Sequence, residues 1–280
     1  GGDLFQSVTE TFTYNALQLL RYKREFGAHS FEVLAAHEAN DFSSENYTDF
    51  KGKSVLPGAT DLDLYLNQLS NSTGFTEGRT LESYFGQLNY DFDDRFYFTG
   101  SIRRDGSSRF ANDKWDTFWS LGGAWVISNE SWLSGNDFLR FLKVKGSYGT
   151  TGDENGVGFF TGVNTFNPSL LGNEAAIRPR TFEDPNLTWE RASQWQVGAE
   201  FSLGSFLDGV IDYYQKDTEN LIFERRVSPS TGVAVIVTND GELRNSGLEF
   251  DMNFHLVNTQ DVTLDLSVNG AVYDNEITVM

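Results

Sequence analysis

The sequence predicts an all-β fold, specifically a segment of a large antiparallel β-barrel that crosses a membrane with its strands. Apolar and polar residues alternate over about ten stretches, many of them close to the roughly 9–11 tilted residues that span a bilayer. Short and long connections also alternate along the chain. Mean hydropathy is only −0.39, which such a barrel allows because only every second strand residue must meet lipid.

The predicted strands follow one another in hairpin order. The clearest is 248–256, where Leu, Phe, Met, Phe and Leu alternate with Glu, Asp, Asn and His. The full set is 12–24, 29–38, 84–90, 96–103, 115–127, 142–148, 194–201, 207–214, 248–256 and 262–272.

The connections between these strands predict two different rims. Three of them, 39–80, 150–188 and 218–244, are long, and we expect them to be extracellular loops because transmembrane barrels have short periplasmic turns and longer extracellular loops. A soluble sandwich remains the alternative, since immunoglobulin-like modules gather their loops in part.

Alternation alone does not say which face of a strand meets which solvent. Trp and Tyr near the strand ends resemble the aromatic girdles of a membrane barrel. If the apolar faces meet lipid, the polar faces line the lumen. The lumen-facing candidates are Arg103, Lys143, Lys145, Gln194, Gln196, Glu200, Glu249 and Asp251.

Composition excludes several classes of function. The net charge of −19 argues against a nucleic-acid partner, because phosphate binding needs a basic surface. The longest apolar run, 233–237, is far too short for a membrane-spanning helix. The absence of Cys removes disulfides and thiolate chemistry.

No motif predicts a catalytic, cofactor or metal site. The three histidines lack an H-E-x-x-H spacing, and no G-x-S-x-G elbow is present. Asp93-Asp94 falls in a predicted tight turn, where Asp is common. Asp153-Glu154 lacks the spaced oxygen ligands of a calcium loop. We therefore expect no enzyme and no cofactor, and substrate-binding residues stay unassigned.

Three arginines concentrate positive charge in this acidic chain. Arg103, Arg104 and Arg109 belong to, or flank, the predicted connection 105–114 and form a candidate cation cluster. They either pair with acidic neighbours to fix an extracellular loop, or contact lipopolysaccharide phosphates or substrate.

Several motifs resemble the barrel of the SusC/RagA family of TonB-linked outer-membrane importers. The strongest are L-N-Y-D-F-D-D-R-F at 88–96 and S-I-R-R-D-G-S-S-R-F at 101–110. Further matches are G-A-W-V-I-S-N-E at 123–130 and L-K-V-K-G-S-Y-G-T-T-G at 142–152, and order and spacing agree from about residue 80 to the end.

The resemblance implies a roughly 22-stranded barrel with a plugged lumen, of which this chain would supply about ten strands. The family's plug domain and TonB-contacting segment have no counterpart in residues 1–280, so we expect them, and the remaining strands, from a longer protein.

The resemblance also implies a function and partners. We expect import of oligosaccharides or peptides across the outer membrane of a Gram-negative, Bacteroidetes-like cell. The implied partners are a SusD-like surface lipoprotein as lid, the TonB complex and outer-membrane lipid. The alternative is a β-rich surface adhesin or carbohydrate-binding module without transport.

Overall fold

The computed structural model describes residues 2–133 and 135–279, and its main element is one large antiparallel sheet. Ten strands follow each other through the sheet in chain order. They are β1 (Leu4–Phe26), β2 (His29–Ser54), β4 (Thr73–Phe92), β5 (Phe96–Ser107), β6 (Trp115–Val126), β7 (Leu139–Asp153), β10 (Glu190–Leu203), β11 (Leu207–Glu219), β14 (Glu242–Asn258) and β15 (Thr263–Val279). The predicted fold class and each of its ten strands are confirmed.

Smaller elements decorate the long connections. β3 (Tyr65–Gln68) pairs with β2 as the eleventh strand of the sheet. Two hairpins stand apart from it: β8 (Thr165–Leu171) with β9 (Glu174–Thr181), and β12 (Ile222–Arg226) with β13 (Val235–Asn239). Three short 3-10 helices, η1 (Leu62–Leu64), η2 (Ile127–Asn129) and η3 (Pro229–Thr231), complete the described elements.

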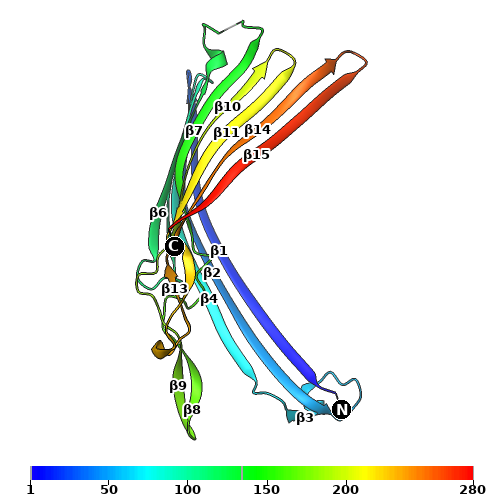
Figure 1. The fold of residues 1–280 in the computed structure, drawn as a ribbon, viewed down its shortest axis with the longest axis vertical. Helices are drawn as coiled ribbons and strands as arrows, with labels where there is room; N and C mark the ends of the chain where they lie inside the picture. The colour runs from blue at the N-terminus through cyan, green and yellow to red at the C-terminus, as the bar shows by residue number, and fades with distance from the viewer. Residues whose placement is uncertain (1, 134, 280) are drawn as a thin grey trace.

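The sheet is strongly bent, and its two ends differ (Figure 1). The β10–β11 and β14–β15 turns lie at one end, and the β8–β9 hairpin and β3 lie at the other. The turn between β4 and β5 has positive φ at both Asp93 (57°) and Asp94 (51°), the backbone of a type I′ hairpin turn. The predicted tight turn at Asp93-Asp94 is therefore confirmed.

One predicted boundary was wrong. Residues 39–80 do not form a single loop, because β2 continues to Ser54 and β4 begins at Thr73. The first strands are accordingly long, with 23 residues in β1 and 26 in β2 against 12 in β5. In Figure 1 they run well past the end of β15.

The sheet is open among the described residues, with β1 and β15 at its edges. Both edges carry exposed apolar side chains, including Phe12 in β1 and Val272 in β15. An unpaired strand edge is not tolerated in lipid because its backbone groups have no partner. A sheet of this length and bend fits a segment of a larger barrel wall.

Candidate functional site: the polar concave face

The eight polar residues predicted to share a face do share one face of the sheet. The register places Lys143 opposite Glu200, and Val210 lies between Glu200 and Asp251. Arg103 lies opposite Phe118, and Ser120, two residues further along β6, lies on the same face as Phe118. Ser120 is opposite Gly149, which in turn is opposite Gln194, so Arg103 and Gln194 share this face. The whole set is Arg103, Lys143, Lys145, Gln194, Gln196, Glu200, Glu249 and Asp251. Residues two apart in a strand point to the same side, so the structure brings these side chains to one surface.

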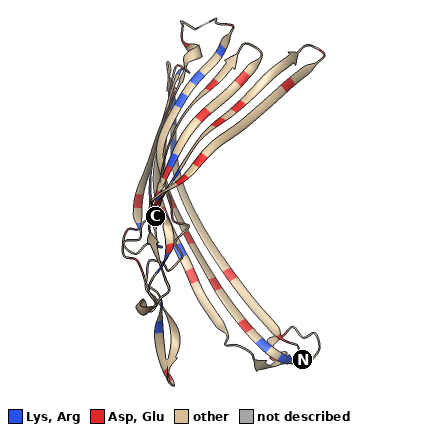
Figure 2. Cartoon of the chain, viewed as in Figure 1, with Lys and Arg blue, Asp and Glu red and all other residues tan. Residues whose placement is uncertain are grey.

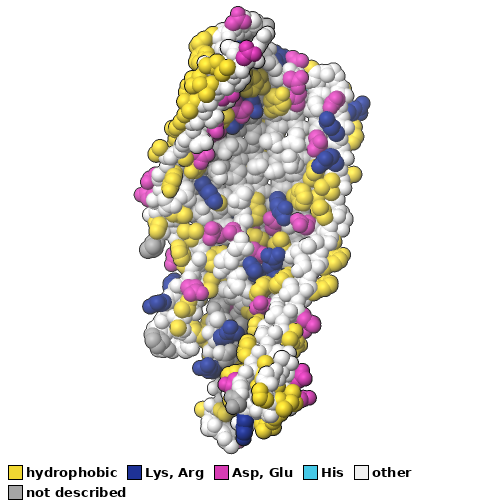
Figure 3. All heavy atoms as spheres, turned by 90° about the vertical axis from the view of Figure 1, so that its right-hand side faces the viewer, with side chains coloured by type: hydrophobic (Ala, Val, Ile, Leu, Met, Phe, Trp, Pro, Cys, Tyr) yellow, Lys and Arg dark blue, Asp and Glu magenta, His cyan; other side chains and the backbone are white. Residues whose placement is uncertain are grey.

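This polar face is the hollowed side of the bent sheet. Figure 3 views the hollow and shows Lys, Arg, Asp and Glu side chains in and around it, with hydrophobic side chains gathered toward the rims. The opposite face is apolar and exposed, with Val197 at 52% and Leu248 at 43% of full exposure. This is the reverse of a soluble barrel, whose apolar face points inward.

Ion pairs connect the strands across the polar face. Lys143 lies 3.4 Å from Glu200, and Lys145 lies 3.3 Å from Glu200 and 3.1 Å from Asp212. Figure 2 shows the same arrangement as blue positions on β7 beside red positions on its neighbours. These side chains are between 26% and 29% exposed, so each ion pair stabilises the sheet only modestly, while together they neutralise the charges of the wall locally.

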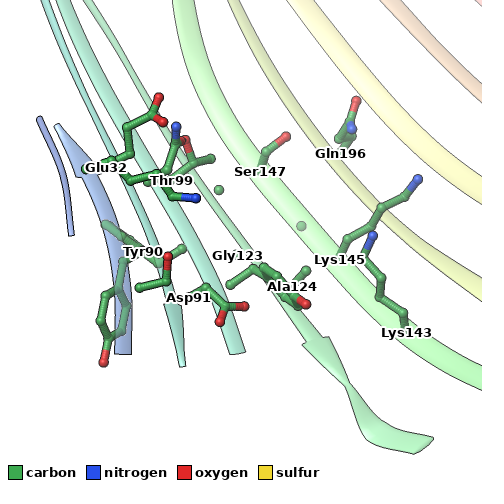
Figure 4. Close-up of a pocket in the computed structure, with 17 residues that line it drawn as sticks. Glu32, Tyr90, Asp91, Thr99, Gly123, Ala124, Lys143, Lys145, Ser147 and Gln196 are labelled. Atoms are coloured by element: carbon green, nitrogen blue, oxygen red, sulfur yellow. The ribbon is translucent and has the colours of Figure 1, made fainter. Parts of the chain in front are cut away.

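A hollow of about 530 Å³ lies on this face between β2 and β10. Figure 4 shows Lys145, Ser147 and Gln196 on one side of it, and Glu32 and Thr99 on the other. Its floor includes Gly122, which has no side chain, and Ala124, whose side chain is a single methyl group, so the hollow stays open. Such a surface offers hydrogen bonds to a hydrated solute.

Arg103 is fully engaged by neighbours on this face. Its Nε donates to Asp105 at 2.7 Å, and its Nη2 donates to Ser83 at 2.9 Å and lies 3.5 Å from Glu38. The guanidinium also lies 5.3 Å from the centre of the Phe85 ring. These contacts join β2, β4 and β5, and they agree with the structural alternative for this arginine.

The predicted cation cluster is divided between the two faces of the sheet. Arg103 and Arg104 are consecutive residues of β5, and consecutive strand residues point to opposite faces. Arg104 therefore lies on the apolar face, 5.6 Å from the Trp115 ring. Arg109 follows the strand, is only 12% exposed and lies 5.1 Å from the Phe159 ring. The prediction was wrong because β5 continues into the expected loop.

A buried ion-pair network lies where the long connections meet the polar face. Glu154, with a side chain 8% exposed, lies 3.0 Å from Arg79 and 3.9 Å from Arg109. Arg109 Nη1 also donates to the backbone oxygen of Glu154 at 3.1 Å. Glu154 thus pairs with arginines and does not match the calcium loop considered for Asp153-Glu154.

The network borders the main buried apolar cluster. This cluster consists of Phe110, Phe118, Val157, Leu187 and Trp189. Trp189 Nε1 donates to the backbone oxygen of Lys114 at 3.2 Å, which satisfies its polar atom. The cluster ties the β5–β6 and β7–β10 connections to β6, and Ile222 and Val237 of the β11–β14 connection pack against it. The sequence did not predict the neighbouring ion-pair network, because 75 residues separate Arg79 from Glu154 and no local pattern marks either.

The structure contains no arrangement that suggests metal chemistry in its described part. There, no group of three or more His, Cys, Asp or Glu could hold a metal ion. His29 and His37 lie in β2, whereas His255 lies in β14. Within the same residues, no helix is long and apolar enough to cross a membrane.

Comparisons with known proteins agree with this geometry. Residues 3–278 match the family model described as TonB dependent receptor-like, beta-barrel. The chain is 32% identical to the TonB-dependent receptor SusC of Bacteroides thetaiotaomicron over 92% of its length, and 29% identical to the TonB-dependent receptor P3 of Formosa agariphila over 98%.

Solved structures show the same fold. The RagAB peptide importer in its closed-closed state matches 99% of this chain and 31% of that chain, with a TM-score of 0.84 at 24% identity. The outer membrane transporter YddB of Escherichia coli matches 98% of this chain and 34% of that chain, with a TM-score of 0.62 at 10% identity.

The chain spans 26% of the length of SusC and 28% of that of P3. Over that span, the sequence and the fold agree with one family, and the resemblance to the SusC/RagA type is confirmed. The chain belongs to the TonB dependent receptor-like, beta-barrel family, and its strands form part of an outer-membrane barrel.

Proposed function

We propose that this chain forms part of the wall of an outer-membrane importer, with the polar concave face toward the lumen and the apolar convex face toward lipid. One observation carries this orientation: ion-paired side chains such as Lys145 and Asp212 occupy the hollowed face, while large apolar side chains are exposed on the other. A transmembrane barrel has this apolar-out, polar-in pattern.

The cargo is an oligosaccharide or a peptide, energised through TonB and enclosed by a SusD-like lipoprotein. Similarity to SusC and the fold shared with the RagAB peptide importer support this proposal. The connections 150–188 and 218–244 are the extracellular docking surfaces for lid and cargo, since loops on a rigid scaffold commonly carry binding. Another part of the full-length protein supplies the plug and the TonB contact.

The wall binds and guides cargo and performs no covalent chemistry. The relatives are receptors, and the polar face presents ion pairs and amides that suit a hydrated solute. No feature of the described residues favours the adhesin or carbohydrate-binding alternative.

Spin labels on two adjacent residues of β14 test the orientation. In the full-length protein in lipid vesicles, a label at Phe250 should be more accessible to oxygen, which concentrates in lipid, and a label at Asp251 to a water-soluble nickel chelate. The two residues occupy opposite faces of one strand, so each is the matched control of the other. Lipid-like accessibility at Asp251 would reverse the assignment.

Transport is tested separately in cells. A strain without the full-length gene should lose growth on one class of glycan or peptide, and the gene should restore it only when TonB is present. Full growth of the deletion strain on all oligosaccharides and peptides tried would contradict the importer proposal. Growth restored without TonB would contradict the energy source.

A further inference from the structure

The apolar face contains a trough that crosses four neighbouring strands, β1, β2, β4 and β5. Its floor and walls are four residues in one cross-strand row, Leu20, Ala35, Gly86 and Ile102. Leu20 and Ile102 are 73% and 57% exposed and stand as walls. Ala35 and Gly86 lie between them with little or no side chain, and the trough measures about 630 Å³.

A polar row closes the trough toward the end of the sheet that carries the long connections. It consists of Gln18, His37, Tyr84 and Arg104, which are also opposite one another in the register. His37 stacks on Tyr84 with ring centres 4.7 Å apart, and Tyr84 lies 6.1 Å from Trp115. The row therefore forms a flat aromatic shelf with one guanidinium, that of Arg104, beside it.

Arg104 carries a charge that no carboxylate neutralises among the described residues. Its ring contact with Trp115 is 5.6 Å, and no ion pair within 4.0 Å includes it, although Arg103 next to it has two. Glu82, in the adjoining row, accepts hydrogen bonds from Tyr84 at 2.6 Å and from His37 at 3.1 Å. The carboxylate of Glu82 is therefore hydrogen-bonded to these two groups and forms no ion pair with Arg104.

The depth of Arg104 matches the outer boundary of the bilayer. The residue lies eight positions after Phe96, where β5 starts at its turn (104 − 96 = 8). With a rise of about 3.3 Å per residue and a tilt of roughly 40°, the distance along the membrane normal is about 20 Å. This approaches the ~25 Å height of the apolar band of such barrels. The backbone of Arg104 is thus about 5 Å inside the outer edge of the band, and its long side chain extends the guanidinium toward the headgroups. Leu20 and Ile102 lie deeper in the band.

We propose that this trough binds one phosphorylated lipid of the outer leaflet, with a phosphate on Arg104 and an acyl chain between Leu20 and Ile102. The inference rests on the proposed orientation of the apolar face toward lipid. Charge complementarity selects the headgroup, because an unpaired guanidinium at the membrane surface binds phosphate with charge-assisted hydrogen bonds. The floor of Ala35 and Gly86 leaves the width of a chain free. Of the three arginines considered for contact with lipid phosphates, only Arg104 keeps that role.

Lipid binding to the full-length protein tests the proposal. The protein is purified in mild detergent, and native mass spectrometry measures retention of added bisphosphoryl lipid A. We expect Arg104→Gln and Gly86→Leu each to lower retention about tenfold, since a hydrogen bond to a charged group and the contacts of a few buried methylenes are each of that order. Arg104→Lys should retain more lipid than Arg104→Gln.

Matched controls lie on the same face. Gly123→Leu makes the same change outside the trough, and an added Cβ meets only ordinary contacts at both sites, with closest atoms at 3.6 Å for Gly86 and 3.7 Å for Gly123. Arg24→Gln removes an exposed arginine near the opposite end of this face. Both controls should bind lipid like the parent. Heat-modifiable gel migration shows whether each barrel is folded, and Ala35→Leu replaces Gly86→Leu if that variant fails.

Three results would overturn the proposal. They are unchanged retention in both Arg104→Gln and the filled-trough variant, equal retention of dephosphorylated lipid A, and complete displacement of the lipid by inorganic phosphate. The last would assign a free-phosphate site without a chain. Failure here leaves the importer proposal standing if Phe250 still reports lipid, whereas a water-exposed Phe250 would remove the basis of both.

Discussion

Removing the Glu154 carboxylate should loosen the end of the sheet where the long connections pack. In Glu154→Ala, Arg79 and Arg109 lose their shared partner; with Glu154 present, their side chains are only 25% and 12% exposed. Breaking a buried ion pair costs about 3–5 kcal/mol. Since Arg79 keeps some water contact and also donates to Asn40 at 2.8 Å, we expect a smaller loss than for a fully buried pair, about 2–3 kcal/mol.

The effect should be local and visible in amide hydrogen exchange of the full-length protein. A loss of 2–3 kcal/mol corresponds to roughly 30- to 150-fold faster exchange in residues 108–114 and 154–164. Glu174→Gln is the matched control, because Glu174 is an exposed acid at the tip of β9. Replacing Arg79 and Glu154 together by Met and Leu should recover much of the protection, since apolar pairs replace buried ion pairs well. Unchanged exchange in Glu154→Ala would refute the reasoning.

Three further perturbations test other parts of the structure. Gly162→Ala should destabilise the same loop end by about 1–3 kcal/mol, because its Cβ would lie 2.5 Å from the backbone oxygen of Arg109; thermal unfolding of the loop end, with Gly123→Ala as control, measures this. Lys145→Met should lower the heat-modification temperature slightly, by loss of its ion pair with Asp212, and an effect as large as that of Glu154→Ala would contradict the exposed-pair argument. Hydrogen bonds from Gln68 and Ser72 lower the pKa of Asp49, so their contribution to docking β3 is present above about pH 4 and is lost as pH falls below it; exchange in β3 that is equal at pH 3 and pH 6, after correction for intrinsic rates, would contradict this.

The sequence pattern predicted those strand segments whose two faces meet different environments. In 248–256, lipid on one side and polar groups on the other impose a period of two, and the structure has a strand there. The polar set from Arg103 to Asp251 was predicted for the same reason. Which face is concave could not be read from alternation, because both orientations give the same period.

The sequence predicted the part of the candidate site that lies on the strands, but not the part formed by the long connections. Lys145 and Asp212 follow from strand register once neighbouring strands are known. Glu154 and its arginines depend on three segments that approach only in the folded chain. The arginines at 103 and 104 show the opposite error: proximity in sequence suggested a cluster, and strand geometry separates the two side chains.

The wrong prediction of a loop at 39–80 shows what apolar–polar alternation along a strand depends on. Beyond residue 38, β2 pairs in continuous register with β1 as far as Lys51 and with β4 as far as Thr48, and its last residues pair with β3. Yet the sequence of 39–54, A-N-D-F-S-S-E-N-Y-T-D-F-K-G-K-S, has no apolar face. Where a strand extends beyond the bilayer, water meets both of its sides, so nothing selects against polar residues on either. Backbone ladder hydrogen bonds then hold the strand together with scattered side-chain contacts, such as the stacking of Phe42 on Phe159. Neither imposes a period of two on side-chain type. Alternation therefore marks the membrane-crossing part of each strand. The first strands extend beyond their alternating segments because backbone pairing, and not the contrast between lipid and water, sets their length.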